Sequence, residues 1–162
     1  DEPVFYDFMR GREIIQFCGE MRGLPMQLIE SRSRELADRL QLAGALEEFA
    51  ENYSRGMKKK LGLICAMLHD PQLLILDEPT NGLDPHSTLV LHALMKETAA
   101  AGRTVFFSTH LLDQAERLCD RVAIVRGGAV AAEGTLAELQ AGFGEGPSPG
   151  QVVFGLPETP AA

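Results

Sequence analysis

The sequence has no excess of positive charge. Its 15 Lys and Arg residues are outnumbered by 23 Asp and Glu residues, which gives a net charge of −8 and an isoelectric point near 5.0. A protein that binds DNA or RNA as its main partner needs a basic surface to neutralise the phosphates. We therefore expect no nucleic acid among the partners of this protein.

The sequence also lacks paired cysteines and long hydrophobic runs. Cys18, Cys65 and Cys119 are odd in number, far apart and set among apolar neighbours. This pattern predicts buried, reduced thiols rather than disulfides or metal ligands, and it favours the cytosol. No apolar run approaches the ~20 residues of a membrane-spanning helix. The chain opens DEPVF, without an initiator Met or a signal peptide, which suggests a piece of a longer protein.

The order of the expected elements predicts an α/β protein in three parts. Residues 1–70 are mainly helical, 71–140 form an α/β core, and the Gly/Pro-rich residues 141–162 are expected to be a flexible tail. Helical periodicity covers residues 12–23, 25–42, 45–50 and 54–68. Strands are expected at 73–76, 104–107 and 121–125, alternating with helices at 85–102 and 111–119. Such alternation is typical of a parallel sheet.

The stretch LLILDEPTNGLDP, residues 73–85, carries the most specific chemistry. Its four apolar residues suit a strand buried on both faces, and Pro79 ends the strand directly after Asp77 and Glu78. Ligands of open α/β sheets bind at the carboxyl ends of strands. Asp77 could hold Mg²⁺, and Glu78 could orient or deprotonate a water for attack on a phosphate. Taken alone, an apolar run followed by two acids is more often a strand that ends in two solvated acids.

A second segment, YSRGMKKK, is a candidate anion site. Ser54 precedes apolar residues at helical spacing, Leu61, Ile64, Cys65 and Leu68, so we expect it to be the N-cap of a helix. Free N–H groups at a helix start attract anions, and Gly56 would let a phosphate approach the backbone. Helix capping alone also explains Ser54. Lys58–Lys60 are expected to form a solvated first turn.

Together these motifs resemble the ATP-binding subunit of ABC transporters. LLILDEPTNGLDP resembles the Walker B motif with its D-loop, and the STH of residues 108–110 resembles the switch histidine. YSRGM is similar to the signature segment, and RVAIVRGGAVAAEG is similar to the hairpin that follows the switch. The resemblance covers about residues 1–140. It implies the carboxyl-side part of a P-loop NTPase, with a parallel sheet core and an α-helical subdomain.

The resemblance implies a role for each residue of the carboxylate pair and its neighbour. Asp77 would support Mg²⁺, Glu78 would act on the attacking water, and His110 would contact the γ-phosphate of ATP. A purely structural alternative stays open for His110, which could cap the helix that follows it.

The resemblance also implies contacts with a second subunit. Ser54, Arg55, Gly56 and Met57 form the signature, and Ser54 and Gly56 would face the γ-phosphate bound by that subunit. Family members sandwich ATP between two head-to-tail domains, and Asp84 would lie at their seam. Asp84 could instead only cap its own helix. Arg55 and Met57 replace the more common Gly and Gln, as in transporters whose membrane partner is of the ABC-2 export type.

The sequence departs from the family in two further places. Asp1 or Glu2 stands where the Q-loop glutamine is expected, and no G-x-x-x-x-G-K-[ST] motif occurs. Without the P-loop, the phosphates of ATP lose their main ligands. We expect ATPase activity in a full-length protein and little in this chain by itself.

The implied function is to drive transport through a separate permease, at the cytoplasmic face of the cell membrane. One alternative is a non-catalytic module that lends its signature to a partner ATPase or docks on a permease. A soluble ABC protein of DNA repair or translation is a third possibility, which the acidic charge disfavours.

Overall fold

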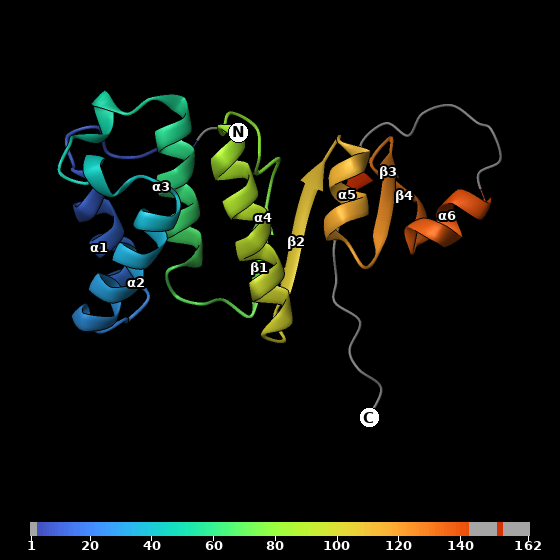
Figure 1. The fold of residues 1–162 in the computed structure, drawn as a ribbon, viewed down its shortest axis with the longest axis horizontal. Coiled ribbons are helices and arrows are strands. Elements are labelled where there is room, and N and C mark those ends of the chain that lie inside the picture. The colour runs from blue at the N-terminus through green and yellow to red at the C-terminus, as the bar shows by residue number, and fades with distance from the viewer. Residues whose placement is uncertain (1–2, 143–151, 154–162) are drawn as a thin grey trace. The chain divides into compact units, whose positions relative to one another are not determined.

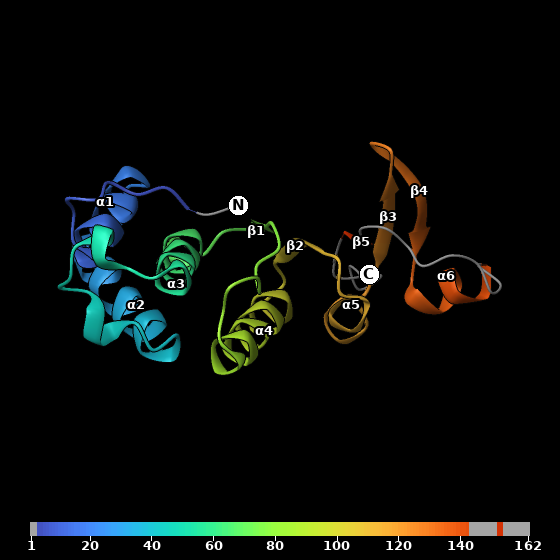
Figure 2. The same cartoon turned by 90° about the horizontal axis from the view of Figure 1, so that it is seen from above.

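The computed structural model describes residues 3–142 and 152–153, which form two compact units (Figures 1 and 2). The helical unit comprises the chain up to Pro71 together with Thr80–Leu91, and the sheet unit comprises Gln72–Pro79 together with the chain from His92 onward. Asp1 and Glu2, at the expected Q-loop position, lie outside the described residues.

The helical unit is built on three helices that pack against one another. They are α1 (Gly11–Met21), α2 (Met26–Arg39) and α3 (Arg55–Met67), and Figures 1 and 2 show them as one group. Their facing apolar side chains are buried, with Ile15, Leu61 and Ile64 at most 1% exposed. Burial of these side chains is the main force that holds the helices together.

The expected helix over residues 45–50 is wrong. Two short 3-10 turns, η1 (Ala43–Ala45) and η2 (Ala50–Asn52), flank this segment instead. The backbone carbonyls of Leu46 and Glu48 accept hydrogen bonds from the first N–H groups of α1, at 3.0 and 3.2 Å. A continuous helix would keep those carbonyls for itself, so pairing with the start of α1 replaces the helix.

Within its described residues, the sheet unit contains five strands in the order β1-β2-β5-β3-β4. The strands are β1 (Leu73–Leu76), β2 (Thr104–Thr109), β3 (Val122–Arg126), β4 (Ala129–Gly134) and β5 (Val152–Val153). The helices are α5 (Leu112–Leu118), α6 (Leu136–Gly142) and α4 (Pro85–Ala100), whose first residues belong to the helical unit. Ala115 of α5 and Val122 of β3 form a small core with partly buried residues of α6.

The α/β class is confirmed, but the sheet is mixed rather than parallel throughout. Among the strands that the structure describes, only β1 and β2 pair in parallel. Strand β5 pairs antiparallel with both β2 and β3, and β3 pairs antiparallel with β4. The three expected strands therefore are not all direct neighbours. Of the expected tail, residues 141–142 belong to α6 and Val152–Val153 to β5, while the rest lies outside the described residues.

β1 is buried on one face, whereas its sequence predicts two buried faces. Leu74 and Leu76 are 3% and 8% exposed, but Leu73 and Ile75 are 52% and 64% exposed. Side chains alternate between the two faces of a strand, so an unbroken apolar run can still bury only every second residue. No described element fully covers the face that carries Leu73 and Ile75. Within the described part of the chain, no helix combines the length and apolarity needed to cross a membrane.

Candidate functional site

Two neighbouring strands of the sheet unit bring four polar side chains together at their carboxyl ends. Asp77 and Glu78 follow β1, and Ser108 and His110 lie at the end of β2, its parallel neighbour. The Ser108 hydroxyl donates a hydrogen bond to Asp77 Oδ1 and accepts one from the Glu78 backbone N–H at 2.8 Å. Ser108 therefore fixes the turn after β1. We call these four residues the carboxylate corner.

The side chains of Glu78 and His110 contact each other directly. His110 Nδ1 lies 2.9 Å from Glu78 Oε1, while the His110 side chain is 55% exposed and that of Glu78 is 17% exposed. The pair holds the carboxylate in one orientation and leaves the imidazole accessible. His110 is thus engaged with Glu78, and the loop that enters α5 is braced instead by Thr109, whose hydroxyl accepts from the Leu111 N–H at 3.1 Å.

The backbone of Glu78 adopts a conformation that side-chain-bearing residues rarely adopt. Its φ angle is +41°, in the left-handed region. Such a conformation costs about 1–3 kcal/mol and persists only where the surroundings enforce it. The hydrogen bond from Glu78 N–H to Ser108 and the turn imposed by Pro79 are surroundings of that kind. Backbone strain of this kind is found most often at active sites, ligand clamps and switch regions.

The residues of the carboxylate corner fit Mg²⁺ only in combination with a phosphate ligand. No group of three or more His, Cys, Asp or Glu side chains is arranged for a metal ion among the residues that the structure describes. Mg²⁺ is usually held by one or two carboxylates, substrate phosphates and waters, so it needs no such group. Asp77, with the Ser108 hydroxyl beside it, offers hard oxygen donors of the required type.

In the helical unit, Ser54 caps α3 as its sequence position predicts. Its hydroxyl accepts a hydrogen bond from the Met57 N–H at 3.2 Å. Arg55, Gly56 and Met57 form the first turn of the helix. A Cβ added to Gly56 would lie 3.0 Å from the carbonyl oxygen of Gly82, so the loop before α4 approaches this turn closely. The small size of Gly56 is needed for this packing, whatever else the turn binds.

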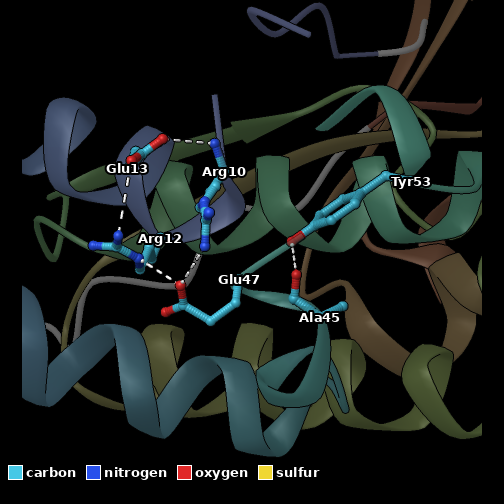
Figure 3. Close-up of polar contacts among 6 residues, drawn as sticks. All are labelled: Arg10, Arg12, Glu13, Ala45, Glu47 and Tyr53. Atoms are coloured by element: carbon cyan, nitrogen blue, oxygen red, sulfur yellow. Dashed lines mark hydrogen bonds and ion pairs between the residues drawn. The ribbon is translucent and has the colours of Figure 1, made fainter. Parts of the chain in front are cut away.

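Tyr53, the residue before the N-cap Ser54, fixes the start of α3 to the segment that precedes it (Figure 3). Its hydroxyl donates a 2.7 Å hydrogen bond to the carbonyl of Ala45, and the side chain is 5% exposed. Burial, reinforced by the carboxylates of Glu48 and Glu47, raises the pKa of Tyr53 to about 12. A Cβ at Gly11 would lie 2.1 Å from the Tyr53 hydroxyl oxygen, so only glycine leaves room for it.

Figure 3 also shows a cluster of ion pairs among Arg10, Arg12 and Glu47 in the helical unit. Glu47 Oε2 accepts hydrogen bonds from Arg12 at 2.8 Å and Arg10 at 3.2 Å. The guanidinium of Arg10 also stacks over the Phe49 ring, 5.2 Å from its centroid. These contacts tie the segment before Tyr53 to the start of α1.

Asp84 lies at the start of α4 and contacts a buried lysine. Its carboxylate accepts hydrogen bonds from the Ser87 N–H at 2.8 Å and the Ser87 hydroxyl at 2.7 Å. Asp84 therefore caps the helix, which is the structural alternative left open by the sequence. The ammonium group of Lys60 lies 2.9 Å from Asp84 Oδ2. Lys60 is only 9% exposed, so the expectation of a solvated lysine run is wrong for this residue. Its position four residues before the buried Ile64 is the sequence signal that indicates burial.

The three contacts of Asp84 predict a pH-dependent stability. Hydrogen bonds from Ser87, and then the contact with Lys60, hold the pKa of Asp84 well below its usual value of 3.8. Because the pKa is lowered in the folded state, the stabilisation is complete above about pH 4 and is lost as the pH falls further. Replacing Asp84 by Asn should cost about 1 kcal/mol at pH 7, since the side chain is 46% exposed.

This difference between wild type and Asp84→Asn should shrink between pH 4 and pH 2, as measured by denaturant unfolding at each pH. Asp38→Asn, which removes an exposed aspartate of α2, controls for the loss of one negative charge. A difference that stays constant down to pH 2 would contradict the role assigned to these contacts.

A separate cleft of about 630 Å³ lies in the sheet unit among α4, β2 and α5. Met95 and Phe107 contribute apolar walls, and Lys96, Glu116 and Arg117 contribute charged groups. Neither Asp77, Glu78 nor His110 lines it. The cleft is therefore distinct from the carboxylate corner.

Comparison with known proteins places this fold in a class and this chain in a family. A family model described as "AAA domain, putative AbiEii toxin, Type IV TA system" matches residues 4–112. A solved structure described as the ATP-binding subunit of an ABC transporter superposes with a TM-score of 0.84 at 36% identity, covering 88% of this chain and 59% of that chain. The fold is that of a P-loop NTPase.

Two curated relatives within this class have sequences similar to that of the chain. The ABC-type transporter ATP-binding protein EcsA of Bacillus subtilis (strain 168) is 38% identical over 89% of this chain and 58% of its own length. The Nod factor export ATP-binding protein I of Sinorhizobium fredii (strain NBRC 101917 / NGR234) is 37% identical over 76% of this chain and 36% of its own length. The chain belongs to the family of ABC transporter ATP-binding proteins. It spans about half the length of the curated relatives it matches.

Proposed function

We propose that this chain is the carboxyl-side part of an ATP-hydrolysing subunit that drives an ABC transporter. The observation that carries the proposal is the carboxylate corner, where the ends of β1 and β2 bring Asp77, Glu78 and His110 to one place. Phosphoryl transfer to water needs a metal-supporting carboxylate and a group that orients the attacking water. The corner supplies both on adjacent strands.

Each side chain of the corner has a distinct task in this proposal. Asp77 supports Mg²⁺, which when bound neutralises charge on the phosphates. Glu78 accepts a proton from the attacking water or orients it, and the contact with His110 keeps its carboxylate in position. The exposed imidazole of His110 is placed to contact the γ-phosphate. The strained backbone of Glu78 fixes the direction of its side chain before substrate arrives.

The helical unit contributes to a second ATP site. The first turn of α3, from Ser54 to Met57, presents backbone N–H groups and the positive end of the helix dipole. We propose that this turn faces the γ-phosphate bound by a second subunit in a head-to-tail dimer. Lys60 contacts Asp84 at the start of α4. We propose that Asp84 lies at the seam of this dimer.

The remaining partners follow from the family. A membrane-spanning permease would be the second partner, and the protein would act in the cytoplasm at the inner face of the cell membrane. A relative named for Nod factor export, together with the YSRGM signature, favours export over import. The substrate would be chosen by the permease. The contact between Glu78 and His110 favours an enzyme over the alternative of a non-catalytic docking module.

ATP turnover tests this proposal directly. The 162 residues contain no G-x-x-x-x-G-K-[ST] motif, so the phosphates need a P-loop from elsewhere in the protein. We expect Mg²⁺-dependent turnover from a protein that carries a P-loop segment ahead of Asp1, and only background turnover from the 162-residue chain. Equal turnover by the two proteins would contradict the proposal that the P-loop and the carboxylate corner are both needed for hydrolysis. Absence of turnover in the longer protein would favour the docking module.

A further inference from the structure

Ser108 is the member of the carboxylate corner that has no task in the proposed reaction. It lies near the carboxyl end of β2 and is partly buried. Its hydroxyl accepts a hydrogen bond from the Glu78 N–H at 2.8 Å and donates one to Asp77 Oδ1. A hydroxyl has one proton, so accepting a bond from the N–H group directs that proton to the carboxylate. One side chain thus contacts two consecutive residues of the site.

The register of the two strands brings this hydroxyl to the end of β1. Leu76, the last residue of β1, pairs with Phe107 in the parallel ladder. Asp77 and Ser108 are the residues that follow this pair, so they lie side by side. Side chains alternate between the faces of a strand, and Phe107 is on the buried face at 2% exposure. Ser108 therefore lies on the other face, and core packing does not explain its hydroxyl.

The hydrogen bond from the Glu78 N–H supports an unfavourable backbone conformation. The φ angle of Glu78 is +41°, which residues with a side chain rarely adopt. The end of β2 holds this residue at two points, because His110 Nδ1 also lies 2.9 Å from Glu78 Oε1. Without the Ser108 hydroxyl, Glu78 keeps only the contact of its side chain. Its backbone could then relax, and the carboxylate would turn away from the attacking water.

The hydrogen bond to Asp77 acts on the other carboxylate of the corner. A group that bonds to a metal-binding side chain fixes the orientation of that side chain, and its loss typically lowers metal affinity or activity about 10- to 100-fold. The Ser108 hydroxyl is placed to act on Asp77 in this way. Loss of the hydroxyl would therefore disturb both carboxylates of the corner, each through a contact of its own.

We propose that Ser108 is a positioning residue for ATP hydrolysis, whose hydroxyl directs Asp77 toward Mg²⁺ and Glu78 toward the attacking water. It acts through these two residues and contacts neither the phosphates nor the water. The inference rests on the proposed ATPase function, which it deepens. It requires a hydroxyl at position 108, which serine and threonine both supply.

Three variants of a protein that also carries a P-loop segment test the proposal. Ser108→Ala removes the hydroxyl, and Ser108→Thr keeps it on a β-branched residue that suits a strand. Thr104→Ala is the control, because it removes a hydroxyl from the same face of β2 at its other end. We expect Ser108→Ala to lower kcat about 10- to 100-fold and to raise the Mg²⁺ concentration for half-maximal turnover about tenfold. At saturating Mg²⁺ the KM for ATP should change little. Ser108→Thr should recover most of the turnover, and Thr104→Ala should match the wild type.

Hydrogen exchange of the Glu78 amide, followed by NMR, gives a readout that needs neither Mg²⁺ nor turnover. This amide should exchange at least about tenfold faster in Ser108→Ala than in the wild type, and Ser108→Thr should restore its protection. The proposal is overturned if Ser108→Ala keeps the wild-type kcat and Mg²⁺ dependence, if Ser108→Thr is no better than Ser108→Ala, or if the Glu78 amide exchanges equally fast in Ser108→Ala and wild type. A wild-type protein without turnover would instead contradict the proposed function, while the exchange rates would still show whether Ser108 holds Glu78.

Discussion

Replacing Glu78 by glutamine in a protein that also carries a P-loop segment is expected to leave ATP binding intact and to lower ATP turnover by more than about 100-fold. Glutamine keeps the size of the side chain and can still contact His110, but it cannot accept a proton from water. The effect should therefore appear in kcat rather than in ATP affinity. Turnover is measured by phosphate release, and affinity by nucleotide titration.

Glu133→Gln provides the matched control, because Glu133 is an exposed glutamate on β4 of the same unit. Its turnover should equal that of the wild type. If Glu78→Gln keeps wild-type turnover, Glu78 has no role in the chemical step. A parallel loss of ATP binding would instead indicate that Glu78 holds the nucleotide.

Truncation of Phe107 to alanine is expected to produce the largest loss of stability in the sheet unit, about 3–5 kcal/mol. Phe107 lies on β2, is 2% exposed, and pairs in register with Leu76 of β1. Its removal leaves a cavity beneath β2, the strand that carries Ser108 and leads into His110. We expect a loss of stability in the lower part of this range. The Phe107 side chain also borders the cleft, so neighbouring side chains can move into part of the space that it leaves.

Ile75→Ala is the control, since Ile75 is a large apolar residue on the adjacent strand with 64% exposure. We expect its free energy of unfolding to stay within about 0.5 kcal/mol of the wild-type value. Denaturant unfolding of both variants measures the difference. A smaller loss for Phe107→Ala than for Ile75→Ala would mean that the two faces of this part of the sheet are assigned the wrong way round.

The sequence predicts those features that depend on local chemistry. Ser54 caps α3 because a hydroxyl before a helical periodicity satisfies a free N–H group, and this needs no distant partner. Asp77 and Glu78 follow a strand because Pro79 ends the run of apolar residues. The capping of α6 by Thr135, with Glu138 bonding back to the Thr135 N–H, follows from the same local rule.

Features that depend on distant partners escape this kind of prediction. Ser108 is separated by 31 residues from Asp77, so its bridging role appears only once β1 and β2 are paired. The sequence predicts that Lys60 is one of three surface lysines, because its contact with Asp84 at the start of α4 forms only in the folded chain. The segment from Leu46 to Phe49 has helical periodicity, yet its carbonyls bond to α1. In each case a tertiary contact decides the outcome over the local pattern.

The roles of the site residues rest on geometry that the sequence predicts only in outline. Asp77, Glu78 and His110 meet in one unit, as the parallel pairing of their strands requires. The contact between Glu78 and His110 adds a reason for the orientation of the carboxylate. Their roles in phosphate chemistry stay predictions, as do those of Ser54, Arg55, Gly56, Met57 and Asp84.

A crystal structure of the P-loop-containing protein with the Glu78→Gln substitution, grown with Mg²⁺ and ATP, tests the central claim most directly. The substitution prevents turnover and so preserves the bound nucleotide. The account predicts Mg²⁺ beside Asp77, the γ-phosphate within hydrogen-bond distance of His110, and a water between that phosphate and residue 78. A nucleotide bound with its phosphates away from Asp77 and His110 would contradict it.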